Sequence, residues 1–69
     1  GNNHAFEMTL LQKINFIREE RYQDLNDWQR EFISDIYEAV QGIEELEIDD
    51  YLTRRQREKA EEIWIDLGL

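Results

Sequence analysis

Residues 26–42, NDWQREFISDIYEAVQG, carry the strongest helical pattern in this 69-residue chain. With the residue before them, they place an apolar side chain at every third or fourth position: Leu25, Trp28, Phe32, Ile36 and Val40. Asp24 or Asn26 could accept hydrogen bonds from the first backbone N–H groups, and Asn26 followed by Gln29 is typical of a capping box at the start of a helix. Gly42 suits the left-handed backbone that ends a helix, and Ile43 would then fold back onto the last turn as in a Schellman motif. We therefore predict a helix over residues 26–41.

Similar patterns on both sides of this segment predict two further helices. The first covers about residues 5–20, with an apolar stripe of Phe6, Leu10, Leu11, Ile14 and Ile17. The second covers residues 54–67, with a stripe of Ala60, Ile63, Trp64 and Leu67. This last helix would begin after Thr53, which forms a capping-box pattern with Gln56, and would end at Gly68.

The predicted helices have polar outer faces and apolar inner stripes, which favours an all-α fold. The alternating apolar and polar residues that strands need are absent from the sequence. The connection at residues 43–51 is expected to pack on the core, with room for an extra short helical turn, through Leu46, Ile48 and Tyr51. We predict a compact three-helix bundle that forms a single domain over residues 1–69.

The composition limits the chemistry available to the chain. There is no cysteine and His4 is the one histidine, so thiolate and zinc sites are excluded and no cofactor is expected. An EF-hand loop aligned from Glu45 would place Asp50 where the loop needs glycine and Gln56 where it needs glutamate. Ser34, the only serine, lies inside a predicted helix and not in a glycine-rich turn. We expect a non-enzymatic protein with no catalytic residues and no metal.

The apolar runs also bear on location. All fall far short of the ~20 residues that a transmembrane helix needs, and no signal-peptide core is recognisable. The lack of cysteine fits a reducing cytosol. We therefore expect a cytoplasmic protein that does not contact a membrane.

The net charge of −9 is concentrated in the middle of the chain. Residues 27–51 hold nine acids against one base, a sum of −8. Along the second predicted helix, acids recur at spacings of three or four: Asp24, Asp27, Glu31, Asp35 and Glu38. Their carboxylates would step by roughly 5 to 6 Å, close to the separation of neighbouring phosphates on a nucleic-acid strand. Further acids would extend the row: Glu44, Glu45, Glu47, Asp49 and Asp50.

Two interpretations of this acidic row stay open. It could imitate nucleic acid and occupy a basic groove on another protein, or it could be an ordinary solvated face that keeps a small protein in solution. Like charges at i,i+4 cost a few tenths of a kcal/mol per pair, and solubility alone would usually mix the signs. A field of this sign repels phosphate backbones, so direct nucleic-acid binding is not expected.

Bases begin the third predicted helix, although a helix N-terminus normally favours acids: Arg54, Arg55, Arg57 and Lys59. One interpretation is that they pair with the acids at residues 44–50 and clamp the connection to the helix. The other is a small phosphate contact in which Tyr51 or Trp64 stacks on a nucleobase. Because the adjacent acids oppose phosphate binding, we favour the clamp.

The segments DWQREFISDIYEAV and LTRRQREKAEEIW together resemble a short helical module of phage and plasmid proteins of DNA metabolism. The resemblance covers about residues 27–67 and lies in core and capping positions: Trp28, Phe32, Ile36, Leu52, Thr53, Gln56, Ile63 and Trp64. It implies a phage-encoded or mobile-element accessory protein, in the host cytoplasm, that works by docking on another protein.

We therefore expect a small acidic regulator or inhibitor that docks on the basic, nucleic-acid-binding surface of a protein partner. An alternative is a protein–protein adaptor that uses exposed aromatic side chains such as Phe16, Tyr22 or Trp64. A weak nucleic-acid binder acting through Arg54, Arg55 and Arg57 ranks lowest. The sequence leaves open whether Ile65 and Leu69, which lie off the main stripe, form a dimer interface.

Overall fold

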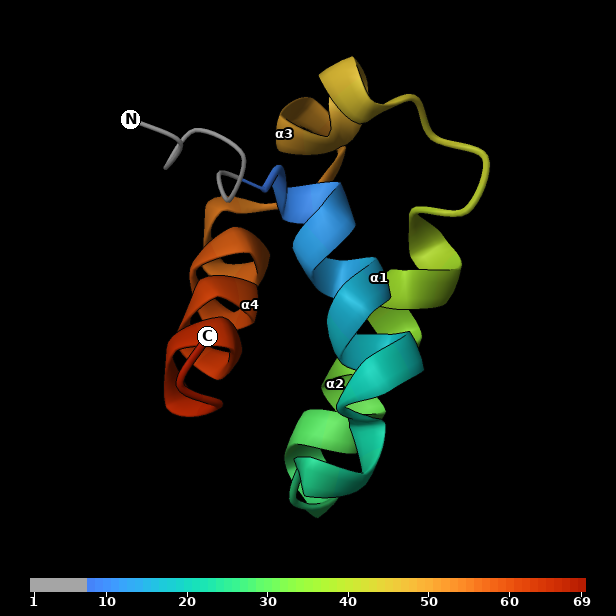
Figure 1. The fold of residues 1–69 in the computed structure, drawn as a ribbon. Coiled ribbons are helices and arrows are strands. Elements are labelled where there is room, and N and C mark those ends of the chain that lie inside the picture. The colour runs from blue at the N-terminus through green and yellow to red at the C-terminus, as the bar shows by residue number, and fades with distance from the viewer. Residues whose placement is uncertain (1–7) are drawn as a thin grey trace.

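A computed structural model describes residues 8–69, and every regular element in that range is helical. Four α-helices and two short 3₁₀ helices follow one another within this range (Figure 1). They are α1 Leu10–Glu20, η2 Tyr22–Asp24, α2 Asp27–Ala39, η3 Glu45–Glu47, α3 Ile48–Tyr51 and α4 Arg54–Asp66. The all-α prediction is confirmed. The helix count differs, because the connection at residues 43–51 forms η3 and the separate short helix α3.

Both predicted capping boxes are present. The Asn26 side chain accepts the Gln29 backbone N–H at 2.9 Å, and the Gln29 carboxamide oxygen accepts the Asn26 N–H at 3.0 Å. Thr53 and Gln56 exchange the same two bonds, at 3.1 and 2.8 Å. Such bonds satisfy backbone donors that have no partner within the helix. They place the starts of α2 and α4 where the sequence predicts them.

The predicted start of the first helix, near residue 5, is wrong. Met8 and Thr9 are not helical, and α1 begins at Leu10. Thr9 caps the helix. Its hydroxyl accepts a hydrogen bond from the Gln12 N–H at 3.2 Å, and the Gln12 carboxamide oxygen accepts one from the Thr9 N–H at 3.0 Å. Phe6, the first residue of the predicted stripe, lies outside the described residues.

A glycine follows the end of α2 and another follows the end of α4, but the two helix ends differ in their hydrogen bonds. Gly42 has a φ of 86° and Gly68 a φ of 79°, a left-handed conformation that glycine adopts without steric cost. After α4, the Leu69 N–H donates to the Trp64 carbonyl at 3.3 Å and the Gly68 N–H to the Ile65 carbonyl at 2.9 Å, which is a Schellman motif. After α2, the Ile43 N–H donates to Val40 at 3.0 Å, so the predicted Schellman motif is replaced by a tighter turn.

Helix α1 packs against both α2 and α4, α2 also touches α4, and α3 lies beside the N-terminal end of α1 (Figure 1). The apolar core at the centre is formed by Ile14, Ile17, Leu25, Ile33, Ile36, Val40, Ile48, Leu52, Ala60 and Ile63. None of the helices in residues 8–69 has the length and apolar character needed to cross a bilayer.

The buried face of α2 is rotated from the predicted stripe. Ile33 is fully buried, whereas Trp28 is 49% exposed and Phe32 only partly buried. Gln29 is also buried, because its side chain closes the capping box at the start of the helix. Trp28 and Phe32 therefore lie at the edge of the core, where they help to form a surface groove.

Candidate interaction surfaces

Four carboxylates project from one side of α2: Asp27, Glu31, Asp35 and Glu38. All four residues are exposed, and none forms an ion pair with another residue in the range 8–69. At 3.6 residues per turn their spacing confines them to roughly 80° of the helix circumference, over ~16 Å of its length. We call this set the acidic face.

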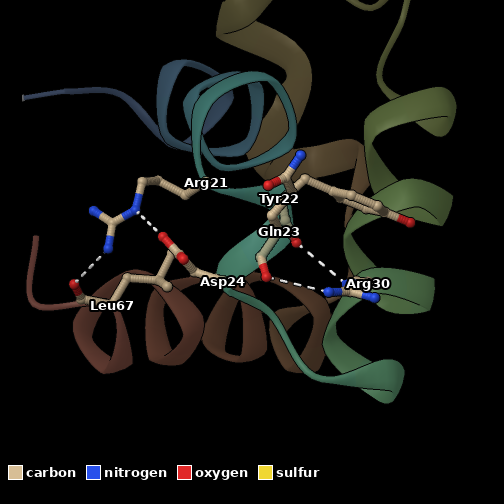
Figure 2. Close-up of polar contacts among 6 residues, drawn as sticks. All are labelled: Arg21, Tyr22, Gln23, Asp24, Arg30 and Leu67. Atoms are coloured by element: carbon tan, nitrogen blue, oxygen red, sulfur yellow. Dashed lines mark hydrogen bonds and ion pairs between the residues drawn. The ribbon is translucent and has the colours of Figure 1, made fainter.

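Asp24 does not belong to the acidic face. It lies in η2, before α2 begins, and its carboxylate accepts a bond from Arg21 Nε at 2.6 Å (Figure 2). Arg21 Nη2 also donates to the Leu67 carbonyl at 3.4 Å. The pair thus ties the turn between α1 and α2 to the C-terminal end of α4, where a cation is also favoured by the helix dipole.

Arg30, the one base among residues 27–51, is directed away from the acidic face. Its Nε donates to the Tyr22 carbonyl at 3.3 Å and its Nη2 to the Gln23 carbonyl at 3.1 Å (Figure 2). The guanidinium therefore binds the first two carbonyls of η2. Because the guanidinium is used there, the carboxylates of the acidic face have no basic partner on their own helix.

The acids of residues 44–50 form a separate cluster. Glu44, Glu45, Glu47, Asp49 and Asp50 are all exposed. The chain changes direction after α2, and η3 and α3 lie by the start of α1 (Figure 1). These carboxylates therefore do not continue the α2 row in a straight line.

The bases at the start of α4 do not pair with the acids of residues 44–50, so the predicted clamp is wrong in its chemistry. Arg54 pairs with Glu58 at 3.0 Å and Lys59 approaches Glu62 at 3.9 Å, both within α4. Arg57 does clamp the connection, but through backbone oxygens: its Nη1 donates to the carbonyl of Leu52 at 2.9 Å and to that of Asp49. Arg55 remains exposed, with no ion pair in the described part of the chain.

The aromatic side chains proposed for an adaptor are largely used inside the fold. Phe16 and Trp64 meet edge to face with ring centroids 5.8 Å apart, and Lys13 Nζ lies 5.5 Å from the Trp64 ring. Tyr22 lies under the Arg18 guanidinium at 4.4 Å, and its hydroxyl accepts a bond from Ser34 at 3.2 Å. These contacts join α1 to α4 and to α2, which leaves little free aromatic surface at these positions.

A groove that sequence reasoning missed lies between α2 and the first turns of α4. It has a volume of about 290 Å³ and is lined by Trp28, Phe32, Thr53, Arg55, Gln56 and Lys59. The rings of Trp28 and Phe32 are 6.3 Å apart, and Lys59 Nζ lies 5.8 Å from the Trp28 ring. We call it the Trp28 groove. The stripe pattern could not reveal it, because that pattern assigned Trp28 and Phe32 to the core.

Tyr37 on α2 donates a hydrogen bond to Glu19 Oε2 on α1 at 3.1 Å. This bond, together with partial burial and the negative charge of Glu19, raises the pKa of the Tyr37 phenol, while nearby Arg18 acts in the opposite direction. The pair is a polar link between two packed helices.

No three His, Cys, Asp or Glu residues within the described range are grouped so that they could hold a metal ion. The Ser34 hydroxyl donates to the Tyr22 hydroxyl, which is not a base that could activate it as a nucleophile. Within residues 8–69 the features that stand out are therefore surfaces for contact.

No protein-family model, curated protein or solved structure matches this chain. A function for this fold and these surfaces can therefore not be transferred from a relative.

Proposed function

We propose that this protein is a non-enzymatic binding module whose acidic face docks on a basic surface of a protein partner. The observation that carries the proposal is the unneutralised row of Asp27, Glu31, Asp35 and Glu38 on α2. Arg30, the one base that the sequence places among these acids, instead donates hydrogen bonds to the carbonyls of η2.

A helical scaffold suits this role because it holds the charges in fixed positions. Carboxylates one turn apart on a capped helix step at an interval similar to that of phosphates, so a groove built for nucleic acid would meet several of them at once. The repulsion within the row costs a few tenths of a kcal/mol per i,i+4 pair. Docking against lysine and arginine would relieve that repulsion and release counterions, as nucleic-acid binding does.

The partner we propose is therefore a nucleic-acid-binding protein, and the consequence of docking would be inhibition or regulation of that protein. The resemblance to modules of phage and plasmid DNA metabolism suits a role of this kind in the host cytoplasm. The two other proposed functions lose support, because Phe16, Tyr22 and Trp64 are packed and Arg54 and Arg57 already have partners.

Affinity capture from a lysate with the tagged chain tests the proposal through a matched pair of variants. Glu31→Lys with Asp35→Lys reverses the centre of the acidic face and changes the net charge from −9 to −5 (−9 + 4). Glu20→Lys with Asp66→Lys makes the same change in charge at exposed positions outside it. Both variants should keep the wild-type helix content.

We expect the wild type and the Glu20/Asp66 variant to retain the same basic protein. The Glu31/Asp35 variant should lose it, and a short nucleic-acid duplex should displace it from the wild type. Capture that depends equally on both charge reversals, or on neither, would show that the row is only a solvated face.

A further inference from the structure

The Trp28 groove differs in chemistry from the rest of this acidic chain. Trp28 and Phe32 supply an aromatic floor, and Arg55 and Lys59 stand at its edge. Lys59 lies 3.9 Å from Glu62, an exposed ion pair that holds its ammonium only weakly. The groove is thus an apolar site with a basic rim, and a suitable occupant would present an apolar side chain flanked by acids.

The chain itself contains such a segment. Leu46 in η3 is 92% exposed, and Glu45 and Glu47 on either side of it are also exposed. In a 3₁₀ helix successive side chains are set roughly 120° apart, so the two carboxylates spread to either side of the leucine. Within its own copy, Leu46 borders a different hollow of about 320 Å³, beside Thr9 at the start of α1, and not the Trp28 groove.

We propose that the Trp28 groove binds the Leu46 turn of a second copy of this chain. Leu46 would cover the rings of Trp28 and Phe32, and the two flanking carboxylates would face Arg55 and Lys59. Apolar surface meets apolar surface and acid meets base, and a groove of about 290 Å³ has room for one leucine side chain. Each copy carries both halves of the contact, so it closes reciprocally in a pair or repeats from copy to copy.

The contact is small, which sets its strength. Stable complexes bury roughly 800 Å² per partner, and one turn in one groove buries far less, so self-association belongs to high protein concentrations. Two copies of net charge −9 also repel each other at long range. The Debye length falls from about 30 Å at 0.01 M salt to about 8 Å at 0.15 M, so salt in this range screens the repulsion more than the close contact.

Self-association is therefore expected to strengthen between ~0.01 and ~0.15 M salt. Docking of the acidic face on a basic partner has the opposite dependence. The two proposals thus stand or fall separately, because they use different residues and respond to salt with opposite sign.

Sedimentation equilibrium of the full chain, from roughly 10 μM to 1 mM at 0.15 M salt, tests the contact. The average mass of the wild type should rise with concentration. Leu46→Ala should weaken the association by about tenfold or more, because it removes a side chain that the contact buries. Ile65→Ala is the matched control, since Ile65 is also exposed, at 68%, but lies on α4 outside the groove.

Charge exchange tests the orientation. Glu45→Arg with Glu47→Arg should weaken association, although it reduces the negative net charge from −9 to −5 (−9 + 4) and with it the repulsion between copies. Arg55→Glu with Lys59→Glu should weaken association as well. All four changes together restore the net charge of −9 and should recover association, because the acids and bases have exchanged places.

Three results would overturn the proposal. The wild type could stay monomeric up to ~1 mM, and any affinity between copies would then be too weak for a specific contact. Ile65→Ala could abolish association where Leu46→Ala does not, which would assign the interface to the outer side of α4. The indole resonance of Trp28 could respond to a short single-stranded oligonucleotide and not to protein concentration, which would assign the groove to nucleobases.

Discussion

The Arg57 guanidinium on α4 donates a hydrogen bond to the Leu52 carbonyl over 2.9 Å, and the same nitrogen reaches the Asp49 carbonyl. A base in the first turn of a helix opposes the helix dipole, but here it satisfies carbonyls at the end of α3. Arg57 therefore joins the short helix α3 to α4. Arg54 and Lys59 pair with acids further along the same helix, whereas Arg55 has no ion pair within residues 8–69.

Replacing Arg57 should loosen this junction. Arg57→Ala is expected to lower the free energy of unfolding by about 1 to 3 kcal/mol, because the carbonyls of Leu52 and Asp49 lose a charged donor and the bond to Leu52 is partly buried. Arg57→Lys should recover only part of the loss, since an ammonium lacks the planar fork. Urea unfolding followed by circular dichroism measures both. Arg55→Ala, at an exposed position, should stay within about 0.5 kcal/mol of the wild type, and an equal loss there would deny Arg57 its role.

The start of α1 depends on Thr9. Thr9→Ala should cost about 1 kcal/mol of unfolding free energy, because the Gln12 N–H loses its acceptor. Thr9→Ser keeps a hydroxyl and should stay close to the wild type. Urea midpoints compare the three proteins, and an alanine variant as stable as the serine variant would show that the helix is not capped at this residue.

The apolar stripe predicts that Trp28 contributes more to stability than Ile33, and the rotation of α2 reverses this order. Ile33→Ala, at a fully buried position, should cost about 2 to 5 kcal/mol. Trp28→Ala should cost only about 1 kcal/mol, because the residue is 49% exposed and its ring meets Phe32 and Lys59 at the surface and not the buried core. Thermal or urea unfolding measures the ranking. A larger loss for Trp28 would mean that the tryptophan, and not Ile33, faces the core.

The hydrogen bond from Tyr37 to Glu19, with partial burial, predicts a pH dependence. The pKa of the phenol is raised above the ordinary value of about 10, so the folded state favours the neutral phenol. Its contribution to stability is fully present below pH ~10 and is lost as the pH rises through the higher pKa of the folded state.

Measuring the unfolding free energy from pH 8 to 11, roughly, for the wild type and Tyr37→Phe isolates this contribution. The difference between the two proteins should shrink at the alkaline end. Glu19→Ala removes both the acceptor and the charge, and it should move the tyrosine absorbance titration toward the ordinary value. A titration that is unchanged by Glu19→Ala would contradict the link.

The parts of the fold that depend on short-range sequence patterns could be predicted. Capping boxes at Asn26 and Thr53 and the left-handed glycines after α2 and α4 act within a few residues, so spacing reveals them. The box at Thr9 has the same T-x-x-Q pattern as the one at Thr53. The apolar stripe does not reveal it, because Phe6 continues that stripe towards the N-terminus and favours an earlier helix start.

The candidate surfaces depend on longer-range arrangement, and prediction was weaker there. Apolar residues on two adjacent sides of α2 do not fix how the helix is rotated about its axis. Packing against α1 and α4 decides this rotation, so the stripe alone wrongly assigns Trp28 to the core. Long basic side chains reach many partners, and the sequence does not show that Arg21, Arg30 and Arg57 contact backbone carbonyls. The exposed row on α2 followed directly from spacing, except for Asp24.

The central claim is that the acidic face is a contact surface, and the salt dependence of partner binding tests it most directly. The affinity of the captured partner would be measured for the wild type, the Glu31/Asp35 variant and the Glu20/Asp66 variant between about 0.05 and 0.3 M salt. We predict that the wild type and the Glu20/Asp66 variant lose affinity steeply and in parallel as salt rises, while the Glu31/Asp35 variant binds weakly throughout. Affinity that is insensitive to salt, or equally reduced in both variants, would contradict the account.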